Sequence, residues 1–170
     1  MMSQPLAERL RPKTLDDYIG QKHLVGQGAV LRKMIDAGRV PSFILWGPPG
    51  VGKTTLAQII ANKLDAPFYT LSAISSGVKD VREVIEKAKS NRFFNTVSPI
   101  LFIDEIHRFS KSQQDSLLNA VETGVVTLIG ATTENPSFEV IRPLLSRCQV
   151  YVLKSLDKND LLTLLHKAIA

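Results

Sequence analysis

The sequence contains a single cysteine, Cys148, among its 170 residues. An internal disulfide needs two cysteines, so the disulfide framework of many small secreted domains is excluded. The three histidines, His23, His107 and His166, are scattered and lack the close spacing that pairs zinc ligands. A zinc site built from cysteine and histidine is therefore not expected.

Long hydrophobic runs are also absent. No apolar stretch approaches the roughly 18 to 20 residues that cross a bilayer, and residues 1–13 lack the apolar segment of a signal peptide. We therefore expect a cytoplasmic protein that makes no membrane contact. The net charge of +5 is compatible with nucleic acid binding, but a mild excess is also common on solvated surfaces, so charge leaves the partner open.

What the sequence does contain is an alternation of strand and helix patterns. Short, continuous apolar runs are typical of parallel strands that are covered on both faces; they occupy residues 43–46, 100–103, 125–131 and 150–153, with a weaker run at 67–71. Apolar residues at helical spacing recur between them, at residues 53–64, 78–90 and 111–124. The pattern predicts an α/β domain, a doubly wound five-stranded parallel sheet with helices on both faces.

The C-terminal segment follows a different pattern. Asp157 and Asp160 have the spacing of a capping box, with aspartate where glutamate is usual, and they precede the apolar helical segment 161–170. The helical pattern is still running at the last residue. We expect a fragment that ends inside the first helix of a second domain.

Residues 47–54, GPPGVGKT, match the phosphate-loop pattern, and they follow a predicted strand and open a predicted helix. Glycines let backbone N–H groups curve around phosphates, and the helix N-terminus adds partial positive charge. Lys53 is expected to reach the β- and γ-phosphates, and the Thr54 hydroxyl to bind Mg²⁺. The alternative, a glycine turn before an ordinary helix, is disfavoured because both flanking elements fit.

Two carboxylates follow the apolar run at residues 100–103. Asp104 is expected to place its carboxylate beside the metal ion, at the carboxyl edge of the sheet. Glu105 can orient and polarise the attacking water as the catalytic base. The competing interpretation of Glu105 is a cap or a salt bridge next to the strand.

Five stretches spanning nearly the whole chain, among them DEIHRF and GATTENPSF, resemble the AAA+ ATPases, and within them the clamp-loader branch. They occupy residues 6–21, 45–57, 101–115, 129–138 and 144–156. The resemblance implies an AAA+ P-loop NTPase core over residues 1–154 and the start of a truncated helical lid over residues 155–170. It also implies ATP and Mg²⁺ as cofactors, with Thr54 and Asp104 as metal ligands.

The resemblance further implies which residues contact the nucleotide. Within residues 1–22, the segments LRP and YIG assign Leu10, Arg11, Tyr18 and Ile19 to the adenine base; without the family they indicate only a proline-containing loop. The phosphate-loop contacts that it implies are Pro49, Gly50, Val51, Gly52, Lys53, Thr54 and Thr55.

Three more residues resemble catalytic positions of the family. Thr132 matches the first sensor, which touches the γ-phosphate or the attacking water, and Thr133 is the alternative because a shift of one residue reverses a strand side chain. Both threonines could instead satisfy the backbone in a turn. Arg147, in SRC, resembles the arginine that a subunit donates to its neighbour's ATP, whereas the competing interpretation is a salt bridge at the edge of the core.

The implied function is DNA-stimulated ATP hydrolysis in replication, recombination and repair at stalled or damaged forks. The implied partners are further copies of the chain (a tetramer or hexamer at full length), single-stranded or forked DNA, and replication proteins such as single-strand-binding protein, in the nucleoid.

A Holliday-junction branch-migration motor is the alternative function, since it shares GPPG, DEIH and GATT. Such motors, however, continue GATT with a small, basic turn rather than ENPSFE. DNA contacts could come from a set of basic residues that could equally be solvated: Lys79, Arg82, Lys87, Lys89, Arg92 and Lys111.

Overall fold

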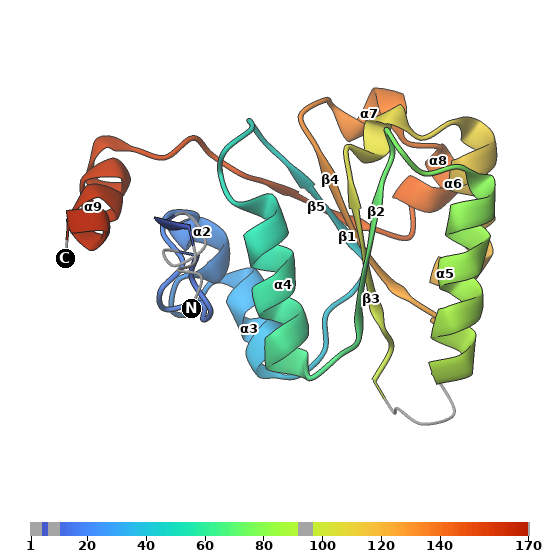
Figure 1. Ribbon diagram of the computed structural model, residues 1–170, viewed down its shortest axis with the longest axis horizontal. Helices are drawn as coiled ribbons and strands as arrows, with labels where there is room; N and C mark the ends of the chain where they lie inside the picture. The colour runs from blue at the N-terminus through green and yellow to red at the C-terminus, as the bar shows by residue number, and fades with distance from the viewer. Residues whose placement is uncertain (1–4, 7–10, 92–96, 170) are drawn as a thin grey trace.

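Five parallel strands form one sheet in the computed structural model, which describes residues 5–6, 11–91 and 97–169 (Figure 1). The strands are β1 (Phe43–Trp46), β2 (Phe68–Ser72), β3 (Ile100–Asp104), β4 (Thr127–Thr132) and β5 (Gln149–Val152). Their order is β2-β3-β4-β1-β5, and every neighbouring pair is parallel. The predicted five-stranded parallel sheet is therefore confirmed.

Helices cover both faces of this sheet, as Figure 1 shows. One face packs against α2 (Lys22–Val25), α3 (Val30–Asp36) and α4 (Lys53–Leu64), and the other against α5 (Val78–Asn91), α6 (Lys111–Glu122) and α8 (Arg142–Leu145). The two faces separate along β1, where Phe43 and Leu45 belong to the first core and Ile44 to the second. This alternation follows from the pleat of a strand that is buried on both sides.

The last strand differs from its prediction. The apolar run at residues 150–153 predicts a strand that is covered on both faces, but β5 lies at the edge of the sheet and pairs only with β1. Val150 and Val152 are 39% and 51% exposed. The prediction of two-sided burial is wrong here because an apolar run does not reveal whether a strand is central or at an edge.

Hydrogen bonds at the helix ends explain where two of the helices begin. The Ser110 hydroxyl accepts from the Gln113 amide, and the Gln113 side chain accepts from the Ser110 amide, so α6 begins with a capping box. Asp157 and Asp160 make the same reciprocal pair at the start of α9 (Lys158–Ile169), at 2.7 and 3.1 Å, as their spacing predicts. Among the described helices, none is long and apolar enough to span a bilayer.

The remaining short helices connect the carboxyl edge of the sheet to its second face. A turn of 3-10 helix, η1 (Ile106–Arg108), follows β3, and α7 (Pro136–Glu139) follows β4. Cys148, which follows α8, packs against the second core, and burial raises the pKa of its thiol to about 12. A thiol with so high a pKa stays protonated near neutral pH, so its role is packing rather than nucleophilic chemistry.

Candidate active site

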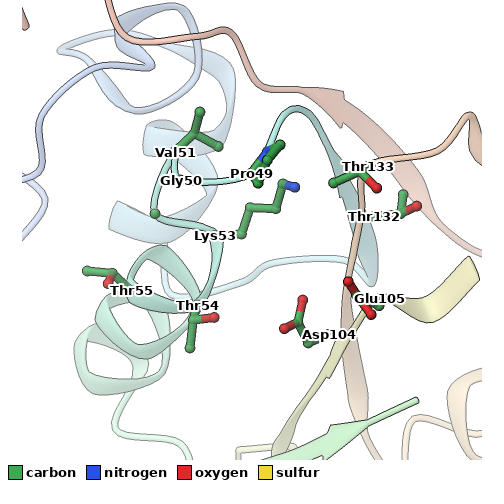
Figure 2. Close-up of a pocket in the computed structure, with 11 residues that line it drawn as sticks. Pro49, Gly50, Val51, Lys53, Thr54, Thr55, Asp104, Glu105, Thr132 and Thr133 are labelled. Atoms are coloured by element: carbon green, nitrogen blue, oxygen red, sulfur yellow. The ribbon is translucent and has the colours of Figure 1, made fainter. Parts of the chain in front are cut away.

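A cavity of about 350 Å³ opens at the carboxyl ends of β3 and β4, against the loop that follows β1. Its walls are residues 49–55 from that loop, Asp104 and Glu105 from the end of β3, and Thr132 and Thr133 from the end of β4 (Figure 2). Parallel strands gather their carboxyl ends at one edge, and ligands of open α/β sheets bind there. All the residues predicted for the phosphate side of the site, apart from Arg147, line this one cavity.

The loop between β1 and α4 has a backbone that only glycine adopts without strain. Gly52, which caps α4, has a φ of 85°, and a Cβ added there would lie 3.1 Å from the Tyr18 hydroxyl oxygen. Lys53 is the first residue of α4, a helix of 12 residues. Because the first N–H groups of a helix have no partner within it, this end of α4 offers donors and a partial positive charge to an anion.

Among the described residues that line the cavity, Lys53 is the only lysine, and Asp104 and Glu105 line the same cavity. Its Nζ donates to the Gly47 carbonyl oxygen at 2.6 Å, which folds the side chain back along the loop. Burial lowers the pKa of Lys53, and the nearby charges of Asp104 and Glu105 offset part of that shift. The ammonium is thus held next to the anion site by one hydrogen bond to the backbone.

Thr54 and Asp104, the two predicted metal ligands, both line the cavity. Both side chains are exposed to it, and Figure 2 shows the Thr54 hydroxyl turned toward the Asp104 carboxylate. Over the described part of the chain, no three His, Cys, Asp or Glu side chains could together hold a metal ion. A pair of protein oxygens suits Mg²⁺, which keeps several waters and binds substrate phosphates rather than an all-protein cage.

Glu105 lies one residue beyond the strand in a strained backbone conformation. Its φ is 52°, in the left-handed region, which costs a non-glycine residue on the order of 1 to 3 kcal/mol and is often found at functional sites. Its Oε2 is buried without a hydrogen bond among the described atoms, although Arg108 Nε forms an ion pair with it at 3.2 Å. The structure therefore contains the salt bridge of the competing interpretation. Glu105 also lines the cavity.

The two threonines at the end of β4 differ in what their hydroxyls do. Thr132 is 1% exposed, and its Oγ1 accepts from the Glu134 amide at 2.9 Å and lies 2.8 Å from His107 Nδ1. Thr133 is exposed and lines the same cavity. The hydroxyl of Thr132, the first choice for the sensor, is thus engaged in a turn, and the geometry favours Thr133, the alternative.

A second, mainly apolar cavity adjoins the loop on the side of the N-terminal segment. It is lined by Tyr18 and Ile19, by residues 50–52 and Thr55 of the loop, and by Leu156 and Leu164 from the C-terminal segment, together with Pro12 and Asp17. The Tyr18 hydroxyl donates to the Val51 carbonyl at 2.7 Å, and burial raises the pKa of this phenol above its usual value. This hydrogen bond fixes the N-terminal segment to the phosphate loop.

Of the other two predicted base contacts, the structure describes only Arg11. Arg11 donates to the Gln58 side chain on α4 at 3.5 Å and does not line this cavity. Leu10 lies outside the described residues. An adenine contact by either residue stays a prediction.

Residues 43–156 match the model of the ATPase family associated with various cellular activities (AAA). The chain belongs to the AAA family. The matched residues run from β1 to the segment before α9, so they contain the whole phosphate-side cavity. The resemblance of the sequence to AAA+ ATPases is confirmed.

Individual relatives of this AAA domain match over almost its full length. It is 54% identical over 165 residues to replication-associated recombination protein A of Haemophilus influenzae, and 52% identical over 165 residues to ATPase WRNIP1 of Dictyostelium discoideum. Each alignment covers 97% of this chain, which spans only 37% and 19% of the length of those relatives. Among solved structures, the Thermotoga maritima RuvB Holliday junction branch migration motor matches with a TM-score of 0.68 and 34% identity, over 86% of this chain and 48% of that one.

Arg147 lies away from the cavity of its own AAA domain. It follows α8, on the face of the sheet opposite α4, and does not line the cavity. Its Nε forms an ion pair with Glu122 Oε1 at 3.7 Å, and the two side chains are 57% and 37% exposed. Exposed pairs of this kind stabilise by about 0 to 1 kcal/mol, so the expected salt bridge exists but holds Arg147 only weakly.

The basic residues considered for DNA binding do not form a uniformly positive face on α5. Lys79, Arg82, Lys87 and Lys89 are exposed, as is Lys111 on α6, but Glu83 and Glu86 are exposed among them, and Lys89 pairs with Glu86 at 3.3 Å. Arg92 lies outside the described residues. This mixture of signs is typical of a solvated helix face, and a DNA contact there stays a prediction.

Sequence patterns did not identify several residues that shape this AAA site. Leu156 and Leu164 enter the apolar cavity from a segment more than 100 residues after the loop, so no local spacing connects them. His107 and Arg108 lie within DEIHRF, where their position next to Glu105 was the available signal. Their partners, the Thr132 hydroxyl and the Glu105 carboxylate, become visible only in three dimensions.

As the pH is raised, the affinity of this AAA domain for ATP is expected to fall. The fall should begin at a lower pH than the ordinary pKa of lysine predicts. Because the pKa of Lys53 is lowered by burial, its positive charge is fully present below that pKa and is lost as the pH rises through it. The triphosphate is attracted by the charged form, so the contribution of Lys53 to the affinity is fully present below that pKa and weakens above it. Calorimetric titration with ATP across a pH series measures this, and Lys53→Arg, which stays charged, should remove the fall. The same fall in Lys53→Arg would assign it to another group.

Proposed function

We propose that this AAA domain binds and hydrolyses ATP in a protein that acts in DNA replication, recombination and repair at stalled or damaged forks. The observation that carries the proposal is that one cavity holds Lys53, Asp104 and Glu105 together against a phosphate loop. The 54% identity to replication-associated recombination protein A supports the replication and recombination role. The role of the whole protein belongs to the proposal because the chain spans 37% of that relative.

Each residue of the cavity has a proposed part in the reaction. The loop amides and Lys53 hold the β- and γ-phosphates, while Glu105 takes a proton from the water whose oxygen attacks the γ-phosphorus. The bond from that phosphorus to the ADP oxygen breaks, and ADP and phosphate leave. Mg²⁺, held by Thr54 and Asp104, would neutralise charge on the phosphates. The Thr133 hydroxyl would contact the γ-phosphate or the water, since Thr133 is exposed and lines the cavity.

The adenine base is proposed to occupy the apolar cavity beside the loop. Tyr18 and Ile19 form one wall, and the backbone of the loop forms another. The proposed domains, residues 1–154 and 155–170, meet here, since Leu156 and Leu164 complete the lining. The lack of buried side chains on α9 and its own capping box support the idea that residues 155–170 open a separate helical lid.

An assembly of several copies is proposed to complete the site. Arg147 lies outside its own cavity and is exposed, so it can be donated to the ATP of a neighbouring copy. A head-to-tail arrangement, as in a ring, places such an arginine at every interface. A tetramer or hexamer at full length follows from the family resemblance, and single-strand-binding protein is a candidate partner in the nucleoid.

A Holliday-junction branch-migration motor is the second candidate function, because the fold and 34% of the aligned residues match RuvB. The two functions differ in the DNA that each would recognise. We expect the full-length protein to hydrolyse ATP severalfold faster with single-stranded or forked DNA, and less so with a four-way junction, when phosphate release is measured at fixed salt. Stimulation by the four-way junction alone would favour the motor, and no stimulation by any DNA would contradict the proposed function.

A further inference from the structure

The N-terminal segment is joined to the segment before α9 by a pair of hydrogen bonds. Gln21 Nε2 donates to the Lys154 carbonyl at 2.6 Å, and the Lys154 amide donates to Gln21 Oε1 at 2.9 Å. The Gln21 side chain is buried, with the residue 5% exposed, and its φ is 56°, in the left-handed region. A strained backbone and a buried amide with both functions paired indicate a specific contact across 133 positions of sequence.

This contact lies at the free edge of the sheet. Beyond β5 the chain continues its pairing with β1, since the Leu153 amide donates to the Trp46 carbonyl at 2.7 Å. The backbone groups of the next residue, Lys154, therefore point outward, where no strand of the described residues follows β5 in the sheet. The Gln21 side chain supplies one donor and one acceptor there, as the backbone of an added strand would. It fixes the place where the chain leaves the sheet toward α9.

The same two segments both line the apolar cavity. Tyr18 and Ile19 precede Gln21, and Leu156 follows Lys154 by two residues. Gly20 has a φ of 85°, and a Cβ added to it would lie 2.8 Å from Leu156 Cδ2, so the two segments are in close contact. A shift at Lys154 therefore moves Leu156 relative to Tyr18.

We infer that Gln21 is a positioning residue for the adenine cavity. Its side-chain amide forms two hydrogen bonds with the Lys154 backbone and so positions Leu156 against the base. This inference rests on the proposed function of the cavity. Gln21 itself does not line the cavity, so it acts through Lys154 and Leu156. The phosphate loop is anchored at its two ends by β1 and α4, so we expect its binding of phosphates not to depend on the Gln21–Lys154 contact.

Two ligands distinguish an effect on the base cavity from an effect on the phosphate loop. ATP has a base, and inorganic tripolyphosphate has none. In the full-length protein, Gln21→Ala and the longer, apolar Gln21→Met should weaken ATP binding about tenfold, because Lys154 loses both hydrogen bonds. Binding of tripolyphosphate to the same variants should stay unchanged in calorimetric titrations. Gln27→Ala, at an exposed glutamine on the same side of the domain, is the matched control and should leave both affinities unchanged.

Three other results would overturn the inference, and they differ in what else they contradict. Equal losses for ATP and tripolyphosphate would make Gln21 a general stabilising residue. If neither affinity changed, the hydrogen bonds between Gln21 and Lys154 would not determine the shape of the base cavity. If the wild-type protein itself bound ATP no more tightly than tripolyphosphate, the proposed base cavity would fail with it.

Discussion

Replacing Glu105 with glutamine is expected to reduce the rate of ATP hydrolysis by about 10²- to 10⁴-fold, the usual contribution of a positioned general base. Glutamine has nearly the same shape and accepts the same backbone strain, but its amide cannot take a proton from water. ATP binding should be unchanged, because Lys53 and the loop amides remain in place. Single-turnover hydrolysis and equilibrium binding, both in the full-length protein, separate the two effects.

Arg108 provides the control that separates catalysis from the salt bridge. Arg108→Ala removes the ion pair to Glu105 but leaves its carboxylate in the cavity. Because Arg108 is exposed, the pair contributes about 0 to 1 kcal/mol, and hydrolysis should change far less than in Glu105→Gln. Glu83→Gln, at an exposed position on α5, controls for the loss of a carboxylate. If Arg108→Ala slowed hydrolysis as much as Glu105→Gln, the salt bridge rather than a proton transfer would explain the loss.

The phosphate side of the site was predictable because its parts are local in sequence. Residues 47–54 carry the loop, the cap and the first turn of α4 in one continuous stretch. Asp104 and Glu105 lie at the end of a strand whose continuous apolar run predicts a place in a parallel sheet, and parallel strands bring their carboxyl ends to the same edge. Local chemistry and sheet topology together place these groups in one cavity.

The features that the sequence did not predict depend on which distant segments meet, or on which of two adjacent side chains makes a contact. The exposure of β5 follows from its place in the strand order, which an apolar run does not encode. The engagement of Thr132 rather than Thr133 depends on which hydroxyl meets His107 and the turn at Glu134. Gln21 and Lys154 are 133 positions apart, and nothing in the two stretches that contain them indicates that they meet. Strand order decided the first of these features, and side-chain hydrogen bonds decided the other two.

Replacing Arg147 with alanine is expected to slow ATP hydrolysis by about 10³-fold in the assembled protein, because an arginine donated in trans stabilises charge on the transferring phosphoryl group. ATP binding to each subunit should persist, since Arg147 does not line its own cavity. Glu122→Ala is the matched control. It removes the ion pair to Arg147 but leaves the arginine, so hydrolysis should stay near the wild-type rate. Equal losses in both variants would assign the effect to the salt bridge.

Mixing two inactive variants tests whether Arg147 acts between subunits. An Arg147→Ala subunit keeps its own phosphate loop, and a Lys53→Ala subunit keeps its arginine, so an interface between them can hold one complete site. In a head-to-tail ring made from equal amounts of both, about one quarter of the sites pair an intact loop with an intact arginine. Hydrolysis should therefore return to about one quarter of the wild-type rate if sites act independently. If the mixed assembly forms and no activity returns, Arg147 does not complete a neighbour's site, and its role is the ion pair with Glu122.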